Sequence, residues 1–352
     1  MEFKKIIDAQ RLFSPETIYL NSATLGLPPL TVKESLERVV GTWYQGKLTA
    51  PMFDQPVENC RQLFAKIINV PCSWVSINST VSQMVGTVVN SLDKGSVVLT
   101  VKNEFTSLLF PLLQKAQCSE IMVREVKPED LIASIDSSID MVAVSAAQSV
   151  DGTVINVDRL VEKAKAHGCK TLIDGTQAIG WYSQAWQEVD YLVAAAYKWL
   201  LCPRGVAFMS VRPEFHADLL PDGPSWFGGE RVWDSIYGSP LRLANDARKC
   251  DASPAWFSWI GAEKALELIH NMGPKLIGEY NVNLANRFLN RIGYETTQSA
   301  IISVNAPGLC QALAKHNIVT SERLGSTRIS FHFYNTEKQV DTAAEFVSKY
   351  LQ

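Results

Sequence analysis

The chain has 352 residues, 47% hydrophobic and 20% charged, which is typical of a soluble globular protein with room for a large and a smaller domain. Its formal net charge of −3 excludes the basic balance expected of a nucleic-acid-binding protein or of one drawn to an anionic membrane. The seven cysteines and five histidines are scattered, without CxxC or HxxxH spacing. The sequence therefore predicts no disulfide framework and no metal site.

The N-terminal stretch MEFKKIIDAQ has no long apolar core after its basic residues, so we do not expect a signal peptide. No later run approaches the roughly 20 apolar residues of a membrane helix. Together with the unpaired cysteines, this predicts a cytoplasmic protein with reduced thiols.

Between about residues 70 and 210, short β-rich runs alternate with segments of helical spacing. Buried strands are predicted at 96–100, 141–147, 170–174, 191–196 and 205–211, and helices at 105–116 and 157–167. Strands alternating with helices indicate βαβ units, and hence an α/β fold with a mostly parallel sheet covered on both faces.

The chain after about residue 240 has a different pattern. A long helix is predicted at 253–270, where a Ser–Pro pair gives a start signal, then a strand at 327–335 and an amphipathic helix at 336–351 with Thr336 as N-cap. We therefore predict a smaller C-terminal α/β domain. The predicted division is an N-terminal segment at 1–25, a large domain at 26–240 and a small domain at 241–352.

The stretch AAYKWLLCPRG (195–205) places Lys198 between two aromatic residues after an apolar run. Burial of its charge costs free energy unless the ammonium reaches water at the end of its flexible stem. The alternative is chemical, because a desolvated lysine has a lowered pKa and can act as a nucleophile that forms a Schiff base.

Other polar and aromatic residues are predicted at the carboxyl ends of strands, where ligands of open α/β sheets bind. Asp174 ends the 170–174 strand and Lys198 follows the next strand, so both can share one crevice; alternatively, Asp174 only caps a turn. Ser79 and Thr80 lie between a short strand and a helix, which suits either a phosphate or an ordinary N-cap. Phe105 begins a helix and could stack on a flat ring or join the core.

These parts fit one ligand when they are taken together. A helix start would hold a phosphate, an acid would hold a ring nitrogen, an aromatic residue would cover the ring, and a lysine would reach an aldehyde. That ligand is pyridoxal 5'-phosphate (PLP).

At the same residues the sequence resembles the class V aminotransferase fold family of PLP enzymes, which includes cysteine desulfurases, kynureninase and isopenicillin N epimerase. The resemblance runs from YLNSATLGLPP (19–29) to TRISFHFYNTEKQVD (327–341) and implies the PLP-dependent transferase fold, fold type I. Within the family, the sequence is most similar to the hercynylcysteine sulfoxide lyases of ergothioneine biosynthesis. The segments that carry this similarity are NEFTSLLFP, AAYKWLLCPRGVAF, YGSPLRLANDARKCDASPAW and RISFHFYN.

The resemblance implies a role for each residue around the cofactor. Lys198 would form the Schiff base and then act as general base at Cα, and Asp174 would keep the pyridinium nitrogen protonated. Gln177 would contact the phenolic oxygen of the ring, unless it is a solvated turn residue. The ring-stacking residue would be Phe105. Phosphate contacts are implied for Ser79, Thr80 and Tyr197, whereas Ala195 replaces a serine that often makes one.

The resemblance also implies substrate contacts and a partner. Arg328 would bind the α-carboxylate of an amino-acid substrate; from the residues alone, a structural salt bridge is the alternative. Ser149, next to Gln148, would contact ring or substrate. Ser253 would reach the phosphate of a neighbouring subunit in a homodimer with shared sites, although it could also be an N-cap ahead of a proline.

The cysteine positions bear on the reaction type. Desulfurases need a thiol on a mobile loop, but the corresponding stretch 316–328 has none, and Cys310 is interpreted as a small buried hydrophobe within a helix. We therefore predict a PLP-dependent carbon–sulfur β-lyase that cleaves a cysteine conjugate or its sulfoxide to a thiol product, pyruvate and ammonia. An aminotransferase or an isopenicillin N epimerase-like enzyme would use the same groups. A non-enzymatic scaffold is disfavoured because both Lys198 and Asp174 are present.

Two segments, 224–238 and 255–261, are dense in aromatic residues. They are interpreted as core or dimer interface. A sharper hypothesis is a cation–π pocket for the quaternary ammonium of a histidine betaine, with Trp226, Trp233 and Trp256 as its walls.

Overall fold

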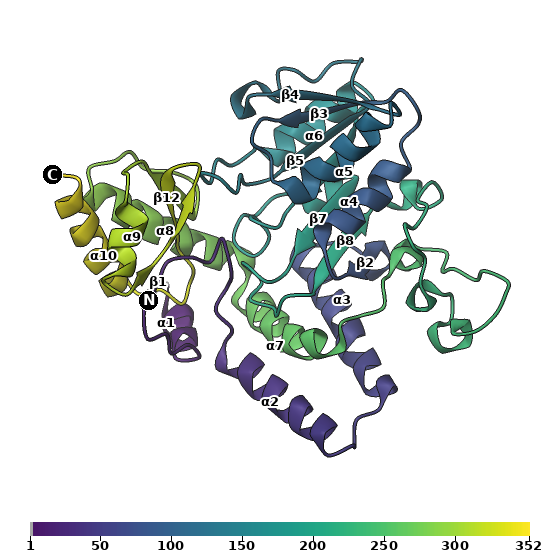
Figure 1. The fold of residues 1–352 in the computed structure, drawn as a ribbon, viewed down its shortest axis with the longest axis horizontal. Helices are drawn as coiled ribbons and strands as arrows, with labels where there is room; N and C mark the ends of the chain where they lie inside the picture. Colours follow the sequence, from purple (N-terminus) through teal and green to yellow (C-terminus); the bar gives the residue numbers. More distant parts are fainter. Residues whose placement is uncertain (1–2) are drawn as a thin grey trace.

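The computed structural model describes residues 3–352, and its centre is a seven-stranded sheet (Figure 1). The strands are β2 (Val75–Asn78), β3 (Val97–Val101), β4 (Met122–Val126), β5 (Met141–Ser145), β6 (Lys170–Asp174), β7 (Tyr191–Ala195) and β8 (Ala207–Val211). They lie in the order β2-β8-β7-β6-β5-β3-β4, and β8 alone runs in the direction opposite to the other six. This confirms the predicted α/β class with a mostly parallel sheet.

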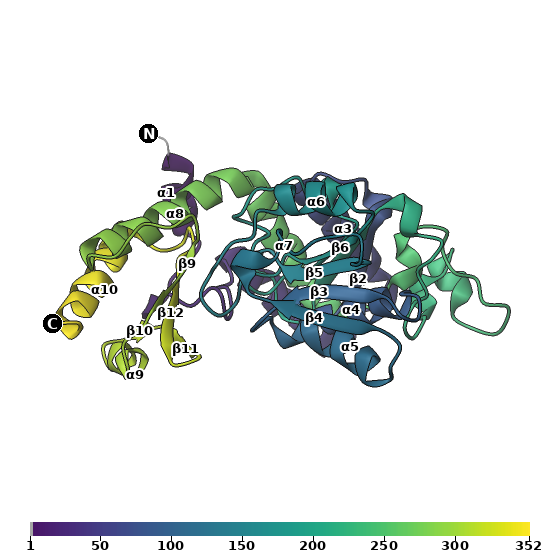
Figure 2. The same ribbon diagram turned by 90° about the horizontal axis from the view of Figure 1, so that it is seen from above.

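Helices cover both faces of this sheet, as Figure 2 shows for α6 and α5. Side chains of successive strand residues point to opposite faces, so Leu172 packs with α4 and α5 while Ile173 packs in the core with α3, α6 and α7. A further helix, α2, packs on α7. The helices around the large sheet are α2 (Leu30–Tyr44), α3 (Asp54–Ile68), α4 (Val81–Asn90), α5 (Thr106–Gln117), α6 (Val157–Ala166) and α7 (Trp256–Met272).

A second, smaller sheet lies at the other end of the molecule (Figure 1). Its antiparallel order is β11-β12-β9, with α8, α9 and α10 around it. Thr336 caps α10 in a capping box, which confirms that expectation. The elements are α8 (Pro274–Arg291), β9 (Ile301–Val304), α9 (Leu309–Ala314), β11 (Ser321–Arg323), β12 (Ser326–Ser330) and α10 (Glu337–Tyr350).

The N-terminal segment packs on this smaller unit. It contains α1 (Lys4–Gln10) and β1 (Ile18–Tyr19), and β1 pairs in parallel with β10 (Ile318–Val319). The division into 1–25, 26–240 and 241–352 remains a proposal. Residues 3–25 pack on the smaller C-terminal unit. Helix α7, although it follows residue 240, packs on α2 and α3 of the larger unit.

Two predicted elements differ in length from those in the structure. The predicted helix 253–270 begins only at Trp256, because the Ala252 N–H donates to the Ile77 carbonyl and keeps the preceding chain extended beside β2. The predicted strand 327–335 ends at Ser330, because the Asn335 side chain and backbone both bond the backbone of His332 and close a turn.

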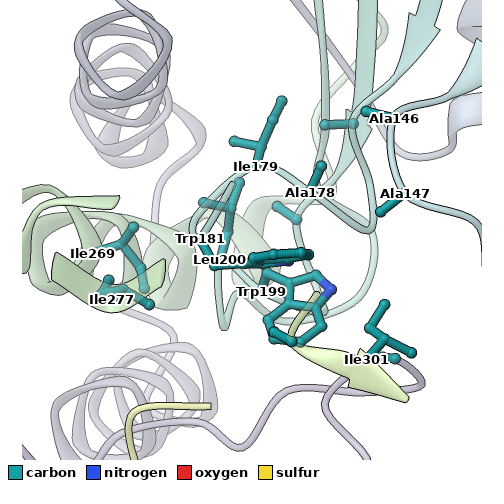
Figure 3. Close-up of a cluster of buried hydrophobic side chains, with 14 of the residues drawn as sticks. Ala146, Ala147, Ala178, Ile179, Trp181, Trp199, Leu200, Ile269, Ile277 and Ile301 are labelled. Atoms are coloured by element: carbon teal, nitrogen blue, oxygen red, sulfur yellow. The ribbon is translucent and has the colours of Figure 1, made fainter. Parts of the chain in front are cut away.

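The residue after Lys198 anchors the junction between the two units. Trp199 is fully buried, its ring centroid lies 5.5 Å from that of Trp181, and Ile277 and Ile301 from the smaller unit complete the cluster shown in Figure 3. On the smaller unit's side, Gly278 in α8 has no room for a side chain, since a Cβ there would lie 1.9 Å from the Trp181 carbonyl oxygen.

We therefore expect Gly278→Ala to destabilise the protein by about 1–3 kcal/mol, because the added methyl group forces α8 away from the backbone of Trp181. Gly41→Ala is the matched control: Gly41 lies within α2, and a Cβ added there would have no neighbouring atom within 4 Å. That change should leave stability equal or raise it by roughly 0.5–1 kcal/mol. If both variants change the melting temperature of the wild type by the same amount, the close packing at Gly278 is contradicted.

Candidate functional site

The candidate site lies at the carboxyl ends of β6 and β7, which are adjacent and parallel. Asp174 is the last residue of β6, and Lys198 lies in the turn that follows β7. Both side chains line one cavity of about 170 Å³. The structure thus brings the two residues into one crevice, at the place where ligands bind in open α/β sheets.

Lys198 is buried, with an exposed fraction of only 5%. Its Nζ lies 5.2 Å from the ring centroid of Phe105 and 5.8 Å from that of Tyr197. Burial lowers the pKa of this amine to about 8, and the nearby Asp174 carboxylate opposes that shift only in part. The side chain therefore does not extend into water, and a substantial fraction of the amine is neutral near pH 8.

Asp174 is equally buried, and its Oδ1 accepts a hydrogen bond of 2.8 Å from the Thr176 N–H. The Thr176 hydroxyl oxygen in turn accepts from the Ala195 N–H at 2.9 Å, which ties the end of β6 to the end of β7. Burial raises the pKa of Asp174 to about 6. The carboxylate therefore closes the local turn and also faces the cavity, where a cationic partner would stabilise its charge.

The start of α4 forms another wall, with Ser79, Thr80 and Ser82 among the lining residues. Thr80 occupies the N-cap position, yet its hydroxyl donates to Gln83 Oε1 at 3.0 Å and accepts no bond from the helix. Because the first N–H groups of a helix have no partner within it, those of α4 remain available to an anion.

Arg204 also lines this cavity and was missed at the level of sequence. Its guanidinium lies 5.5 Å from the ring centroid of Tyr197, so the tyrosine ring supports a cation beside the start of α4. The sequence feature that could have revealed it is an arginine six residues after Lys198, in the stretch 195–205 that contains no acidic residue. The pocket therefore offers an anion two cations, Lys198 and Arg204.

Gln177 is a buried junction, 3% exposed, which contradicts the alternative of a solvated turn residue. Its Nε2 donates to the Ala23 carbonyl at 2.9 Å and to Ser149 Oγ at 3.3 Å, and its Oε1 accepts from Trp199 Nε1 at 2.9 Å. It thereby holds the N-terminal segment, Ser149 and the chain next to Lys198 together at the cavity.

Arg328 comes from β12 of the smaller unit and is 1% exposed. It donates to Ser149 Oγ at 3.0 Å and to Thr24 Oγ1 at 2.7 Å, while its buried Nε has no partner within residues 3–352. The alternative of a structural salt bridge is therefore wrong, because these partners are neutral. Since Ser149 lines the cavity, Arg328 stands directly behind its wall.

Glu104 is a second residue that sequence reasoning missed. It is 4% exposed, and its carboxylate accepts from the Ser145 hydroxyl at 2.6 Å, the Gln148 amide at 3.1 Å and the Phe105 N–H at 2.7 Å. This network fixes Phe105, which is 41% exposed at the cavity and so is not a core aromatic. The signal was an acidic residue directly before the predicted stacking ring.

Some predicted residues do not meet at this cavity. Ser253 is exposed and lies outside the lining, and α7 has Ala255 at its N-cap position, so the N-cap alternative for Ser253 is wrong. The three tryptophans of the cation–π hypothesis also lie elsewhere: Trp226 contacts Trp233, and Trp256 stacks on Phe53 at 4.9 Å. Within one subunit, the interpretation as packing aromatics is the one that the structure supports.

Residues 37–303 match the profile of the family described as aminotransferase class-V. The chain belongs to the class-V aminotransferase family. Like this chain, the family's members depend on PLP, so the cofactor predicted from the sequence is confirmed.

Two curated relatives align with most of the chain. An uncharacterized aminotransferase, YcbU of Bacillus subtilis, is 25% identical over an alignment of 315 residues that covers 84% of each chain. An isopenicillin N epimerase of Amycolatopsis lactamdurans is 24% identical over 311 residues, covering 77% of this chain and 78% of that one. Each of the two alignments therefore covers more than three quarters of this chain.

Among solved structures, the cystine C–S lyase C-DES in complex with cysteine persulfide has a TM-score of 0.85 at 17% identity and covers 95% of this class-V chain and 97% of its own. A C-DES variant with glycine covalently linked to PLP has a TM-score of 0.84. At such identity the likeness shows the shared fold.

The residues of the site fit PLP. A buried amine with a lowered pKa faces a buried carboxylate, an aromatic ring lies beside the amine, and hydroxyls, helix N–H groups and a guanidinium surround the same cavity.

In the part of the chain that the structure describes, no helix combines the length and apolar character needed to cross a bilayer.

Proposed function

We propose that this class-V enzyme is a PLP-dependent carbon–sulfur β-lyase acting on a cysteine conjugate or its sulfoxide. The observation that carries the proposal is that Lys198 and Asp174 line one cavity together with Ser149, that Arg328 bonds Ser149 and has no carboxylate partner, and that the lining includes no cysteine. The site is therefore equipped to bind an amino acid and remove a proton from it, but offers no thiol to accept sulfur.

Each residue has a separate task in this scheme. PLP, when bound, supplies an electron sink that stabilises negative charge at Cα. Arg328, which bonds Ser149 of the cavity lining, binds the α-carboxylate of the substrate, and Lys198 takes the Cα proton. Asp174 would keep the ring nitrogen protonated, and Phe105 and Gln177 would hold the ring in place.

The leaving group then determines the sulfur product. A thioether conjugate releases a thiolate, whereas a sulfoxide releases a sulfenate that a thiol co-reactant must reduce to the thiol. The three-carbon enamine that remains hydrolyses to pyruvate and ammonia. The resemblance to hercynylcysteine sulfoxide lyases makes the conjugate of a histidine betaine our candidate sulfoxide.

Persulfide-forming desulfuration is a poorer fit. Cys310 lies in α9 and its Sγ accepts a hydrogen bond from Thr320 Oγ1 at 3.5 Å, and it is not among the residues that line the cavity. It is half-buried rather than fully buried, but it is held within a helix and not on a mobile loop.

We further propose that the enzyme works in the cytoplasm as a homodimer with shared sites. Ser253 is exposed and lies outside the cavity of its own subunit, which leaves its hydroxyl available to the phosphate in a partner's cavity. Ser253→Ala should then weaken PLP binding without changing the melting temperature of the apoprotein.

Arg204 supports the phosphate end in the same proposal. We expect Arg204→Gln to raise the dissociation constant of PLP roughly 5- to 10-fold, because a charge-assisted contact to the phosphate is lost. The affinity for pyridoxal, which has no phosphate, should not change. Titration of the apoprotein with both compounds, followed by absorbance, checks this; an equal loss for both would mean that Arg204 only shapes the pocket.

The reaction type is tested with holoenzyme and a panel of cysteine conjugates and sulfoxides. A β-lyase releases pyruvate, ammonia and the thiol or sulfenate in equal amounts without any added keto acid. An aminotransferase, which uses the same residues, would turn over only when a keto acid is supplied, and that outcome would overturn the proposal.

A further inference from the structure

Two arginines meet at one oxygen atom beside the site. Arg323 on β11 and Arg328 on β12 lie on neighbouring antiparallel strands, and both reach towards the N-terminal segment. The Thr24 hydroxyl oxygen accepts from Arg328 Nη2 at 2.7 Å and from Arg323 Nη2 at 3.2 Å. Two guanidinium groups are thus held side by side.

Neither arginine has an anionic partner among residues 3–352. The other hydrogen bonds of Arg323 and Arg328 go to the Glu322 carbonyl and to the carbonyl and hydroxyl oxygens of Ser149, all of them neutral. Arg328 is 1% exposed and its buried Nε has no acceptor, whereas Arg323 is half-buried. Two neighbouring cations without a carboxylate repel each other, and this cost is relieved when anionic groups bind.

The charge of the pair acts on the reactive amine. Arg328 and Arg323 both lower the pKa of Lys198 through their charge, in addition to the larger effect of burial. Arg328 is joined to the cavity through Ser149, which also contacts Gln177, while Arg323 lies farther towards the surface on β11. An extended substrate leaving the cavity on this side would meet Arg328 first and Arg323 next.

We propose that Arg328 and Arg323 form a two-anion site, in which Arg328 binds the α-carboxylate and Arg323 binds a second carboxylate on the sulfur substituent. This inference rests on the proposed lyase function and narrows its substrate class to cysteine conjugates with an acidic S-substituent. The carboxylate of a betaine conjugate meets this condition.

The test uses holoenzyme and pairs of compounds that differ only in the distal charge. L-2-aminopimelate has a methylene in place of sulfur and cannot eliminate, so its binding is measured directly and compared with that of its distal amide. We expect the acid to bind at least about 10-fold more tightly than the amide, since a charge-assisted hydrogen bond is lost with the amide. Turnover is measured with S-(2-carboxyethyl)-L-cysteine and S-(2-carbamoylethyl)-L-cysteine.

Arg323→Gln should abolish the preference for the acid while leaving the binding of the amide unchanged. Arg328→Gln should weaken both compounds. The matched control is Arg159→Gln, because Arg159 is an exposed arginine on α6 outside the cavity, and this variant should keep the wild-type preference.

Two outcomes overturn the two-anion site. In the first, the wild-type enzyme binds the acid and the amide equally, so no second anion is recognised. In the second, Arg323→Gln weakens the binding of both compounds equally, which would assign Arg323 to the α-carboxylate instead. Failure of the lyase function looks different: neither sulfur compound would then yield pyruvate, while the binding preference for aminopimelate would persist.

Discussion

Replacing Lys198 by alanine should lower the rate of pyruvate release by at least about 10³-fold, because general-base catalysis alone contributes 10²–10⁴-fold and the covalent link to the cofactor is lost as well. Borohydride should fix the cofactor to position 198 of the wild-type protein and to no position of the variant. Mass spectrometry of the digested protein, together with the pyruvate assay, measures both effects.

Lys170→Ala is the matched control for this change. Lys170 also lies above an aromatic ring, with its Nζ 5.3 Å from the ring centroid of Phe215, but it begins β6 and does not line the cavity. Its loss should leave both the adduct and the turnover intact. Substantial turnover in Lys198→Ala, or an adduct at another lysine, would contradict the assigned role.

The stability of the apoprotein separates this catalytic effect from misfolding. The folded-state pKa of Lys198, about 8, lies below its ordinary value of 10.5. The folded state therefore bears the full cost of burying the charge below pH 8, and this cost is relieved as the pH rises from 8 to 10.5. At pH 7 the apo form of the Lys198→Ala variant should accordingly melt no lower than the apo wild type.

The part of the site that the sequence could predict comes from local patterns. Asp174 ends an apolar strand and Lys198 follows the next one, so the parallel-sheet rule alone places both at one edge. The start of α4 could be found in the same way, because a strand, two hydroxyl residues and a helix follow one another in the chain.

The part that could not be predicted depends on contacts between distant segments. Thr24 and Arg328 are hydrogen-bonded although most of the chain separates them, and nothing in either neighbourhood signals the other. Glu104 is an ordinary acid in the sequence, and its role at Phe105 exists only because β5 brings Ser145 to it. The late start of α7 likewise follows from the Ala252–Ile77 bond, which overrides the Ser–Pro start signal.

Asp174→Asn is the second change for which we expect a large effect, a loss of turnover on the order of 10²-fold. The asparagine can still accept from the Thr176 N–H, so the turn should survive, but it has no charge to hold a ring nitrogen protonated. Asp190→Asn is the matched control, since Asp190 is also a buried carboxylate with a raised pKa and bonds Thr171 outside the cavity. Equal losses of turnover in the two variants would reduce Asp174 to a structural residue.

The pH dependence of ligand stabilisation gives Asp174 a signature that a structural role would not produce. Its folded-state pKa of about 6 lies above its ordinary value of 3.8, so the cost of the buried charge is absent below pH 3.8 and fully present above pH 6. A cationic ring nitrogen relieves that cost only when Asp174 is ionised. Pyridoxal is used as the ligand because it has no phosphate that titrates in this range. It should therefore raise the melting temperature of the wild type more than that of the Asp174→Asn variant, and this difference should grow from pH 5 to pH 7. A margin that stays constant over this range would show that the Asp174 charge does not act on the ring, even if the variant is inactive.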